Sequence, residues 1–196
     1  MFKPFISDIP SGFKIDNKFI QQNICLYDIK IKLIVIGDNQ SNKQSIINAI
    51  LNKHSANYDY QSNINLDINK TLVSYKNKII EIELFDINEK LMQSNIINIY
   101  YQLSNSLIYI INPINLSTEY INNLTTKIQN IKKISKDNIK ISLAVNIESM
   151  GNNLINDSFK DLAQKLNITL LYYKSDSFDI DNQMFIQFID NIIFKN

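Results

Sequence analysis

Short apolar runs rich in β-branched residues alternate along the chain with longer segments whose apolar positions recur every three or four residues. This alternation is typical of a mostly parallel sheet whose connecting helices pack on its faces. The short runs predict six strands, near residues 31–36, 70–76, 79–85, 106–111, 140–145 and 168–173. The longer segments predict about five helices, near residues 44–53, 91–103, 117–134, 157–166 and 181–194. The pattern therefore predicts an α/β fold.

One strand pair departs from the parallel scheme. Only the short turn Asn77-Lys78 separates the runs 70–76 and 79–85, too few residues for the crossover that parallel strands need. We therefore expect a six-stranded, mostly parallel sheet with one antiparallel edge strand. Residues 1–29 match no periodic element, so we interpret them as an N-terminal extension or docking arm, followed by one domain at 30–196.

Composition excludes several classes of protein. A chain of 196 residues, 45% of them hydrophobic and only 3 of them Gly, suffices for one compact domain with a substantial core. The net charge is +1 and there is no Arg, which argues against a nucleic-acid partner. No apolar run approaches the roughly 18 residues of a membrane-spanning helix. The single Cys25 cannot form an internal disulfide, which favours a reducing compartment.

Candidate chemistry lies where the first predicted strand ends, in Gly37-Asp-Asn-Gln-Ser-Asn42-Lys43-Gln44-Ser45. In a G-x-x-x-x-G-K-[ST] loop, backbone N–H groups cradle phosphates, the Lys neutralises them and the hydroxyl holds Mg²⁺. Gly37 and Lys43 stand at the spacing of such a loop. Asn42 replaces its second Gly, however, and Gln44 replaces its magnesium-binding hydroxyl. The frame of a phosphate loop is present without its full set of groups.

Four further sequence segments follow the loop, and their order and spacing carry more information than any one of them. They are Ser62–Ile68, Glu81–Asp86, Tyr100-Tyr101 and Ser106–Asn112. With the loop, they resemble a Ras-superfamily small GTPase, most closely the Rab branch, over residues 30–194. The resemblance implies a P-loop NTPase (Ras-like) three-layer sandwich.

The resemblance also assigns roles to single positions. It implies that Gly37 opens the loop, Lys43 is the phosphate cation, Asp86 is an indirect magnesium ligand and Asn146 is the first residue of the guanine-binding N-K-x-D. Taken singly, these residues also fit structural roles. Lys43 is ordinary in the first turn of a helix, Asp86 as a strand-end cap and Asn146 as a turn former.

Other working positions of the family are changed. Asn63 replaces the switch I Thr, Glu89 the D-x-x-G glycine, Lys90 the water-orienting Gln, and Ser149 the Asp that pairs with guanine. A carboxylate about 4 Å from a γ-phosphate oxygen costs on the order of 4 kcal/mol at an effective dielectric of 20. We therefore expect no catalytic residues and a vestigial nucleotide-binding set: Gly37, Asn42, Lys43, Gln44, Ser45, Asp86 and Asn146.

A receiver domain is an alternative with a parallel sheet and carboxylates after its strands. It requires a pair of acids after the first strand and a Lys after the fifth. Only Asp38 and Asp86 are placed for it, and the fifth predicted strand ends in Val145-Asn146-Ile147.

The leading hypothesis is a catalytically inactive pseudo-GTPase without a cofactor or metal, acting as a protein-interaction subunit of a larger cytoplasmic assembly. The alternative is a divergent switch that binds GDP or GTP with Mg²⁺ weakly. The chain ends without the cysteines that Rab proteins use for prenylation, so we expect no direct membrane anchor. Non-prenylated Rab-like proteins in trafficking and ciliary complexes suggest an association with the cytoskeleton or the cilium, by analogy alone. Expected partner contacts are apolar and aromatic: Tyr58, Tyr60, Leu91, Met92, Phe2, Phe5 and Phe13.

Overall fold

The computed structural model describes residues 27–38, 41, 43–52, 60–61, 66–92, 94–111, 117–136, 138–146, 153–173 and 182–193. Its strands are β1 (Ile29–Gly37), β2 (Tyr60–Gln61), β3 (Leu66–Tyr75), β4 (Lys78–Ile87), β5 (Ser106–Ile111), β6 (Lys140–Asn146) and β7 (Thr169–Tyr173). Its helices are α1 (Lys43–Asn52), α2 (Glu89–Met92), α3 (Ile97–Leu103), α4 (Thr118–Ile134), α5 (Asn153–Leu166) and α6 (Asn182–Ile193). No helix of this described part is long and apolar enough to cross a membrane.

The strands form one sheet in the order β2-β3-β4-β1-β5-β6-β7. β1 is central and pairs in parallel with both β4 and β5, and β6 and β7 continue the parallel arrangement. β3 pairs antiparallel with β4, and β2 pairs antiparallel with β3. The carboxyl ends of the parallel strands therefore meet at one edge of the sheet, which is where ligands bind in open α/β folds.

The β3–β4 hairpin turns on Lys76 and Asn77, whose φ angles are 48° and 61°. Two consecutive residues with positive φ between paired Tyr75 and Lys78 match a type I′ turn, whose twist suits a two-residue hairpin. The sequence predicts this turn one residue later, at Asn77-Lys78. Antiparallel pairing of the two strands is confirmed.

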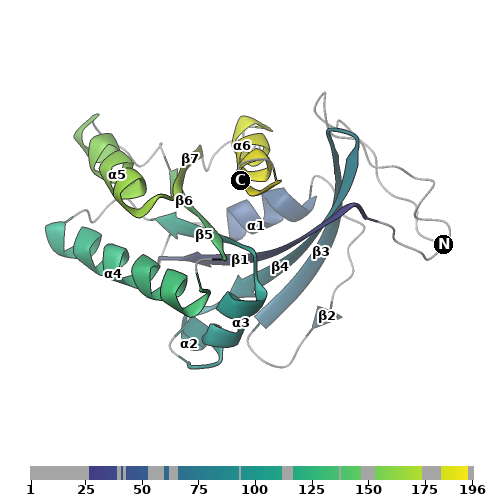
Figure 1. Ribbon diagram of the computed structural model, residues 1–196, viewed down its shortest axis with the longest axis horizontal. Coiled ribbons are helices and arrows are strands. Elements are labelled where there is room, and N and C mark those ends of the chain that lie inside the picture. The colour runs from purple at the N-terminus through teal and green to yellow at the C-terminus, as the bar shows by residue number, and fades with distance from the viewer. Residues whose placement is uncertain are drawn as a thin grey trace.

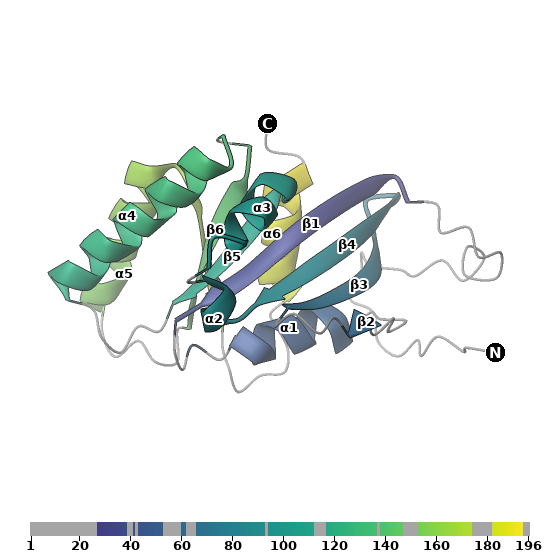
Figure 2. The ribbon, with the colours of Figure 1, turned by 90° about the horizontal axis from the view of Figure 1, so that it is seen from below.

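Helices cover both faces of the sheet, which makes three layers (Figure 1). α1 and α6 pack on one face, against a cluster that includes Leu33, Val35 and Ile82. α2, α3, α4 and α5 pack on the other face, as the view from below shows, against a cluster that includes Ile34, Ile36 and Leu107 (Figure 2). Consecutive residues of β1 thus point into opposite layers, so this strand is apolar nearly throughout, as expected of one buried on both faces.

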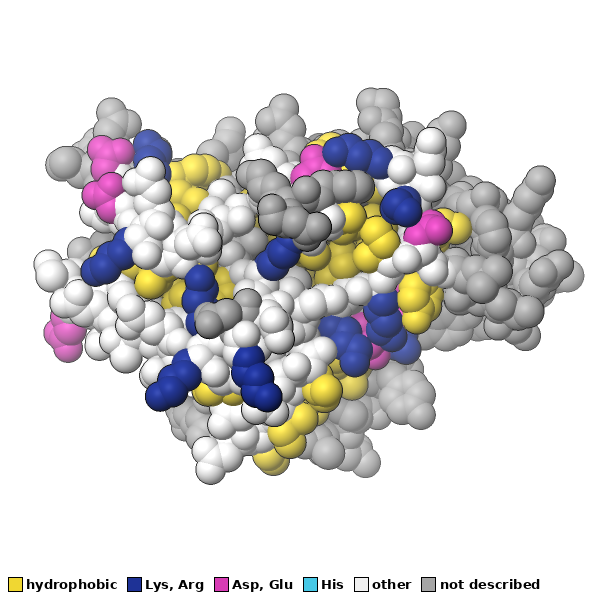
Figure 3. All heavy atoms as spheres, viewed as in Figure 1, with side chains coloured by type: hydrophobic (Ala, Val, Ile, Leu, Met, Phe, Trp, Pro, Cys, Tyr) yellow, Lys and Arg dark blue, Asp and Glu magenta, His cyan; other side chains and the backbone are white. Residues whose placement is uncertain are grey.

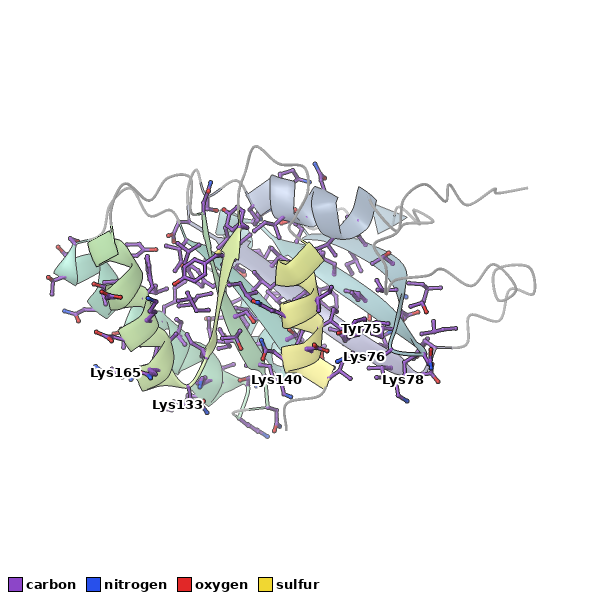
Figure 4. The ribbon with its side chains drawn as sticks, turned by 90° about the horizontal axis from the view of Figure 1, so that it is seen from above. Tyr75, Lys76, Lys78, Lys133, Lys140 and Lys165 are labelled. Carbon is purple, nitrogen blue, oxygen red and sulfur yellow. The ribbon has the colours of Figure 1, made fainter. Side chains whose placement is uncertain are left out.

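Polar contacts fix the ends of the helices. The Ser117 side chain caps α4 by accepting a hydrogen bond from the Tyr120 amide at 3.0 Å. At the other face Lys140 donates to the carbonyls of Asn191 and Ile192, at the C-terminal end of α6. Lys76 pairs with Asp190 of α6 at 2.8 Å, and Figure 4 shows it and Tyr75 beside this helix. These contacts join α6 to both halves of the sheet.

All six predicted strands occur, and the fold class is confirmed. The structure adds β2, a pair of residues whose extended form depends on pairing with β3 rather than on an apolar pattern. The single helix predicted over 91–103 is two helices, α2 and α3. The Ser94 amide and hydroxyl both donate to the Leu91 carbonyl, and such local bonds compete with helix continuation.

Candidate nucleotide-binding site

The loop after β1 turns back tightly over its own start. The Asp38 amide donates to the Ile110 carbonyl at 3.0 Å, and the Ser41 amide donates to the Asp38 carbonyl at 3.1 Å. A Cβ on Gly37 would lie 2.5 Å from Ser41 Oγ and 3.2 Å from the Ile110 carbonyl oxygen. Ser41 would have to turn its hydroxyl away, and the Ile110 carbonyl leaves little further room, so a side chain at this position would disturb the close approach that glycine allows. Gly37 therefore permits the fold of the loop.

Lys43 begins α1, and its side chain reaches across to the end of β4. Its Nζ forms an ion pair with Asp86 and also donates to the Ile87 carbonyl at 2.7 Å. The side chains of Lys43 and Asp86 are only 22% and 14% exposed. The structure thus brings together the predicted phosphate cation and the predicted magnesium-associated carboxylate, bonded to each other.

The other predicted nucleotide-binding residues are not gathered in the same way. Gln44 donates from its side-chain amide to Asn48 Oδ1 at 3.1 Å, one turn along the exposed surface of α1. Asn146 is buried at the end of β6, opposite Tyr173 of β7. Ser45 lies in α1, but its side chain is outside the described part of the chain, as is Asn42 altogether.

Two residues that sequence reasoning missed hold the middle of the loop. The Tyr173 hydroxyl donates to the Ser41 carbonyl at 2.8 Å in a buried position. Ser41 is itself 5% exposed, and its Oγ has no hydrogen-bond partner among the described residues. A buried hydroxyl without a partner is unusual in a folded protein. This hydroxyl lies directly over Gly37, at the start of the loop.

A second set of residues, which the sequence pattern does not reveal, holds Asp38. The Tyr109 hydroxyl of β5 donates to Asp38 Oδ1 at 3.0 Å, and the Tyr120 hydroxyl of α4 donates to Oδ2. Lys127 of α4 donates to the Tyr109 oxygen at 2.9 Å and lies 4.9 Å from the centre of its ring. Burial and the neighbouring Asp38 carboxylate raise the pKa of both tyrosines, so each keeps its proton for donation at neutral pH.

One sequence signal for this network existed. Tyr109 places a hydroxyl in the middle of the apolar run 107–111, where a buried polar atom needs a partner. Its partner lies 71 residues earlier in the chain, which a local pattern does not reveal.

The segments that would complete a GTPase site are described only in part. Asn63 and Ser149 fall outside the described residues, and the side chains of Glu89 and Lys90 are not described. α2 begins directly after Asn88, whose side chain caps it by accepting a hydrogen bond from the Leu91 amide at 2.9 Å.

A divalent metal finds few ligands in this arrangement. No group of three His, Cys, Asp or Glu side chains suited to a metal ion occurs within the part of the chain that the structure describes. Asp86, the one carboxylate that the family pattern assigns to magnesium, is paired with Lys43. Among the described residues, the Asp38–Ser41 turn and Lys43 stand where the family has its phosphate loop, while Gln44 replaces the hydroxyl that would hold Mg²⁺.

Of the residues predicted to contact a partner, the structure describes the side chains of Leu91 and Met92. Leu91 is only 5% exposed and packs in the core below α2, so the expectation that it lies on the surface is wrong. Its apolar side chain instead packs in the hydrophobic cluster on that face of the sheet. Met92 is partly buried against the same core. Tyr60 lies in β2 without a described side chain, and Phe2, Phe5, Phe13 and Tyr58 are outside the described residues.

Exposed apolar side chains lie one element further along. Ile96, Ile99 and Leu103, at the start and along α3, are 49%, 55% and 56% exposed. Their spacing places them on one side of the helix, while Ile97 and Tyr101 face the core. Figure 3 shows lysine side chains scattered over this side of the molecule, with hydrophobic side chains between them.

Comparison with known proteins agrees with the fold and the loop. None of the curated proteins matches the chain. A protein-family model does match: Ras of Complex, Roc, domain of DAPkinase, over residues 32–148. This span is well over half of the chain and runs from β1, through the phosphate loop and the Lys43–Asp86 pair, to just beyond Asn146. The chain therefore belongs to the Roc family of GTPase domains in the Ras superfamily.

Proposed function

We propose that this chain is a pseudo-GTPase with the motif order of the Rab branch. It serves as a rigid interaction subunit of a larger cytoplasmic assembly and does not turn over nucleotide. The observation that carries the proposal is the use of Lys43, whose ammonium group is already bonded to Asp86 and the Ile87 carbonyl. A polyphosphate at this position has to replace those bonds rather than neutralise a free cation.

The magnitude of this competition supports the proposal. A hydrogen bond in which one group is charged contributes about 1.5–3 kcal/mol. The Lys43 ammonium group makes two such bonds, one to the Asp86 carboxylate and one to the Ile87 carbonyl. In a working loop, Mg²⁺ held by a Ser or Thr hydroxyl offsets such a loss. Here Gln44 stands at that position and is turned toward Asn48.

The base-binding side of the site is changed as well. Ser149 stands where the family has the Asp that pairs with guanine. Losing its hydrogen bonds costs roughly 1.5–3 kcal/mol each and removes the selectivity for guanine. Asn146 alone, buried at the end of β6, offers no substitute.

The proposed function of the domain is binding to another protein, and α3 offers an exposed apolar surface for that contact. Ile96, Ile99 and Leu103 form an exposed apolar stripe next to α2. Interface cores are depleted in charge and enriched in large apolar groups, so the stripe suits a protein partner with an apolar contact surface. An N-terminal docking arm, cytoplasmic location and an association with the cytoskeleton or the cilium belong to the same proposal, by analogy with non-prenylated Rab-like subunits.

A second candidate function is a divergent switch that binds GDP or GTP weakly. The close approach of Ser41 to Gly37 favours it, and so does the buried Ser41 Oγ, which has no partner within the part of the chain that the structure describes. On this reading, Lys43 exchanges Asp86 for a phosphate when ligand is present.

Nucleotide content distinguishes the two functions. The purified full chain is denatured, and the released nucleotides are separated by chromatography. The pseudo-GTPase proposal expects far less than one nucleotide per chain, and no thermal stabilisation by millimolar GTP with Mg²⁺. A ligand at a hundredfold excess over its Kd would add about 2.7 kcal/mol of stability. Near-stoichiometric GDP or GTP, or a rise in Tm with GTP but not ATP, would make the switch the better proposal.

A further inference from the structure

The network around Asp38 joins the phosphate loop to a helix that the family pattern does not assign to it. Asp38 is the first loop residue after β1, whereas Tyr120 and Lys127 belong to α4, which is remote in sequence. Tyr120 and Lys127 are seven residues apart, so they lie on the same side of α4, two turns from each other. That side faces β5 and the loop.

The directions of the hydrogen bonds leave little freedom. An ammonium group only donates, so the Tyr109 oxygen accepts from Lys127 and its own proton is directed elsewhere. That proton goes to Asp38, an acceptor, which receives a second proton from Tyr120. The chain of donation runs from Lys127 through Tyr109 to Asp38 and meets Tyr120 there. Lys127 can only donate and the Asp38 carboxylate can only accept, which sets the direction of both tyrosine hydroxyls.

Two described residues of the loop, Asp38 and Ser41, are held by protein groups. Asp38 is fixed from β5 and α4, and its carbonyl accepts from the Ser41 amide. The Ser41 carbonyl in turn accepts from Tyr173 of β7. Here side chains from β5, α4 and β7 already provide bonds to the loop.

We propose that α4 sets the position of the start of the phosphate loop in two ways: through the Tyr120–Asp38 hydrogen bond, and through Lys127, which donates to the Tyr109 hydroxyl that bonds Asp38. Asp38, with the Ser41 amide that it holds, and the first three turns of α4 then move as one unit. A partner that shifts α4 therefore shifts the loop, and a ligand that rearranges the loop is felt at α4. This coupling does not depend on the proposed function, because it acts through side chains of the chain itself, whichever ligand the loop takes.

Hydrogen exchange on the full chain tests this coupling. Tyr120→Phe removes one hydroxyl and keeps the ring. We expect amide exchange to rise about tenfold both in the loop, at Ser41 and Lys43, and in the first turns of α4, with β7 and α5 unchanged. A tenfold change corresponds to about 1.4 kcal/mol, close to the value of one hydrogen bond to a charged group. Tyr100→Phe is the matched control, because it also removes a hydroxyl and keeps the ring. The Tyr100 ring packs on Phe85, with 5.6 Å between the ring centroids, and is not part of the Asp38 network.

A second variant guards against a general loss of stability. Asp38→Asn keeps the shape of the side chain but loses its charge, and combining it with Tyr120→Phe should add little to either single change. Wild-type exchange in the loop of Tyr120→Phe would overturn the proposal. So would a uniform rise over the whole chain, equal effects in Tyr100→Phe, or independent effects of the two substitutions.

Discussion

Replacing Lys43 by Ala tests the most unusual feature of the site, a phosphate-loop lysine bonded within the protein. In a chain that holds no nucleotide, an unused lysine at a loop would be dispensable. The Asp86 side chain is only 14% exposed, and removing Lys43 deprives it of its cation. The Ile87 carbonyl loses the same donor. We therefore expect Lys43→Ala to destabilise the nucleotide-free protein.

The size of the effect follows from burial. Breaking a fully buried ion pair by removing one partner costs about 3–5 kcal/mol, and a single hydrogen bond to a charged group contributes about 1.5–3 kcal/mol. With side chains 22% and 14% exposed, Lys43 and Asp86 lie between these cases, so we expect about 2–3 kcal/mol. For a domain of this size, that lowers Tm by roughly 4–12 °C.

The assay is urea unfolding of protein from which nucleotide has been shown to be absent, so that loss of a ligand cannot imitate loss of the ion pair. Lys160→Ala is the control, because Lys160 pairs with Asp157 at 3.3 Å with both side chains more than half exposed. It should change stability by less than about 0.5 kcal/mol. Asp86→Asn should resemble Lys43→Ala, and the double variant should cost less than the sum. A wild-type midpoint for Lys43→Ala would refute the structural role of the pair.

Three further predictions concern activity, pH and surface. Magnesium-dependent GTP hydrolysis should stay at background, and Lys90→Gln should not restore it, because the hydroxyl that holds Mg²⁺ is also missing; robust hydrolysis that Lys43→Ala abolishes would contradict this. Desolvation raises the pKa of the buried Tyr101 hydroxyl to about 12, so above its ordinary pKa of 10.0 the folded chain keeps a proton that the unfolded chain has lost. The free energy of unfolding should therefore fall as pH rises from about 10 to 12, less steeply in Tyr101→Phe, and equal slopes would count against it. Ile99→Glu should leave Tm within about 1 °C yet release a partner held in a pull-down, whereas Leu91→Ala should lower Tm by several degrees; loss of the partner only in a folded Lys43→Ala chain would mean that nucleotide governs binding.

Much of the fold follows from local pattern. The run Ile31–Ile36 is apolar at every position but one, which predicts a strand buried on both faces, and β1 is that strand. The short spacing between residues 75 and 78 forbids a crossover, so antiparallel pairing of β3 and β4 was predictable. The prediction failed where a local polar contact overrides the pattern: apolar periodicity continues through 91–103, but Ser94 bonds to the Leu91 carbonyl at the end of α2.

For the candidate site, too, part of the answer follows from the sequence and part from the structure. The sequence by itself determined which groups are present and which are missing: Gly37 and Lys43 at loop spacing, Gln44 in place of a hydroxyl, and the order of blocks that identifies the superfamily. These are statements about residue type and spacing along the chain, and they need no coordinates.

Only the tertiary structure decided what those groups bond to. Lys43 meets Asp86 because β4 lies beside β1, and Asp38 meets Tyr109 and Tyr120 because β5 and α4 pack against the loop. These partners are separated by 43, 71 and 82 residues. Periodicity reports which face of an element is buried, but not which distant element covers it. The bonds that occupy this loop therefore arise from sheet order and helix packing, which close the distance between residues far apart in the chain.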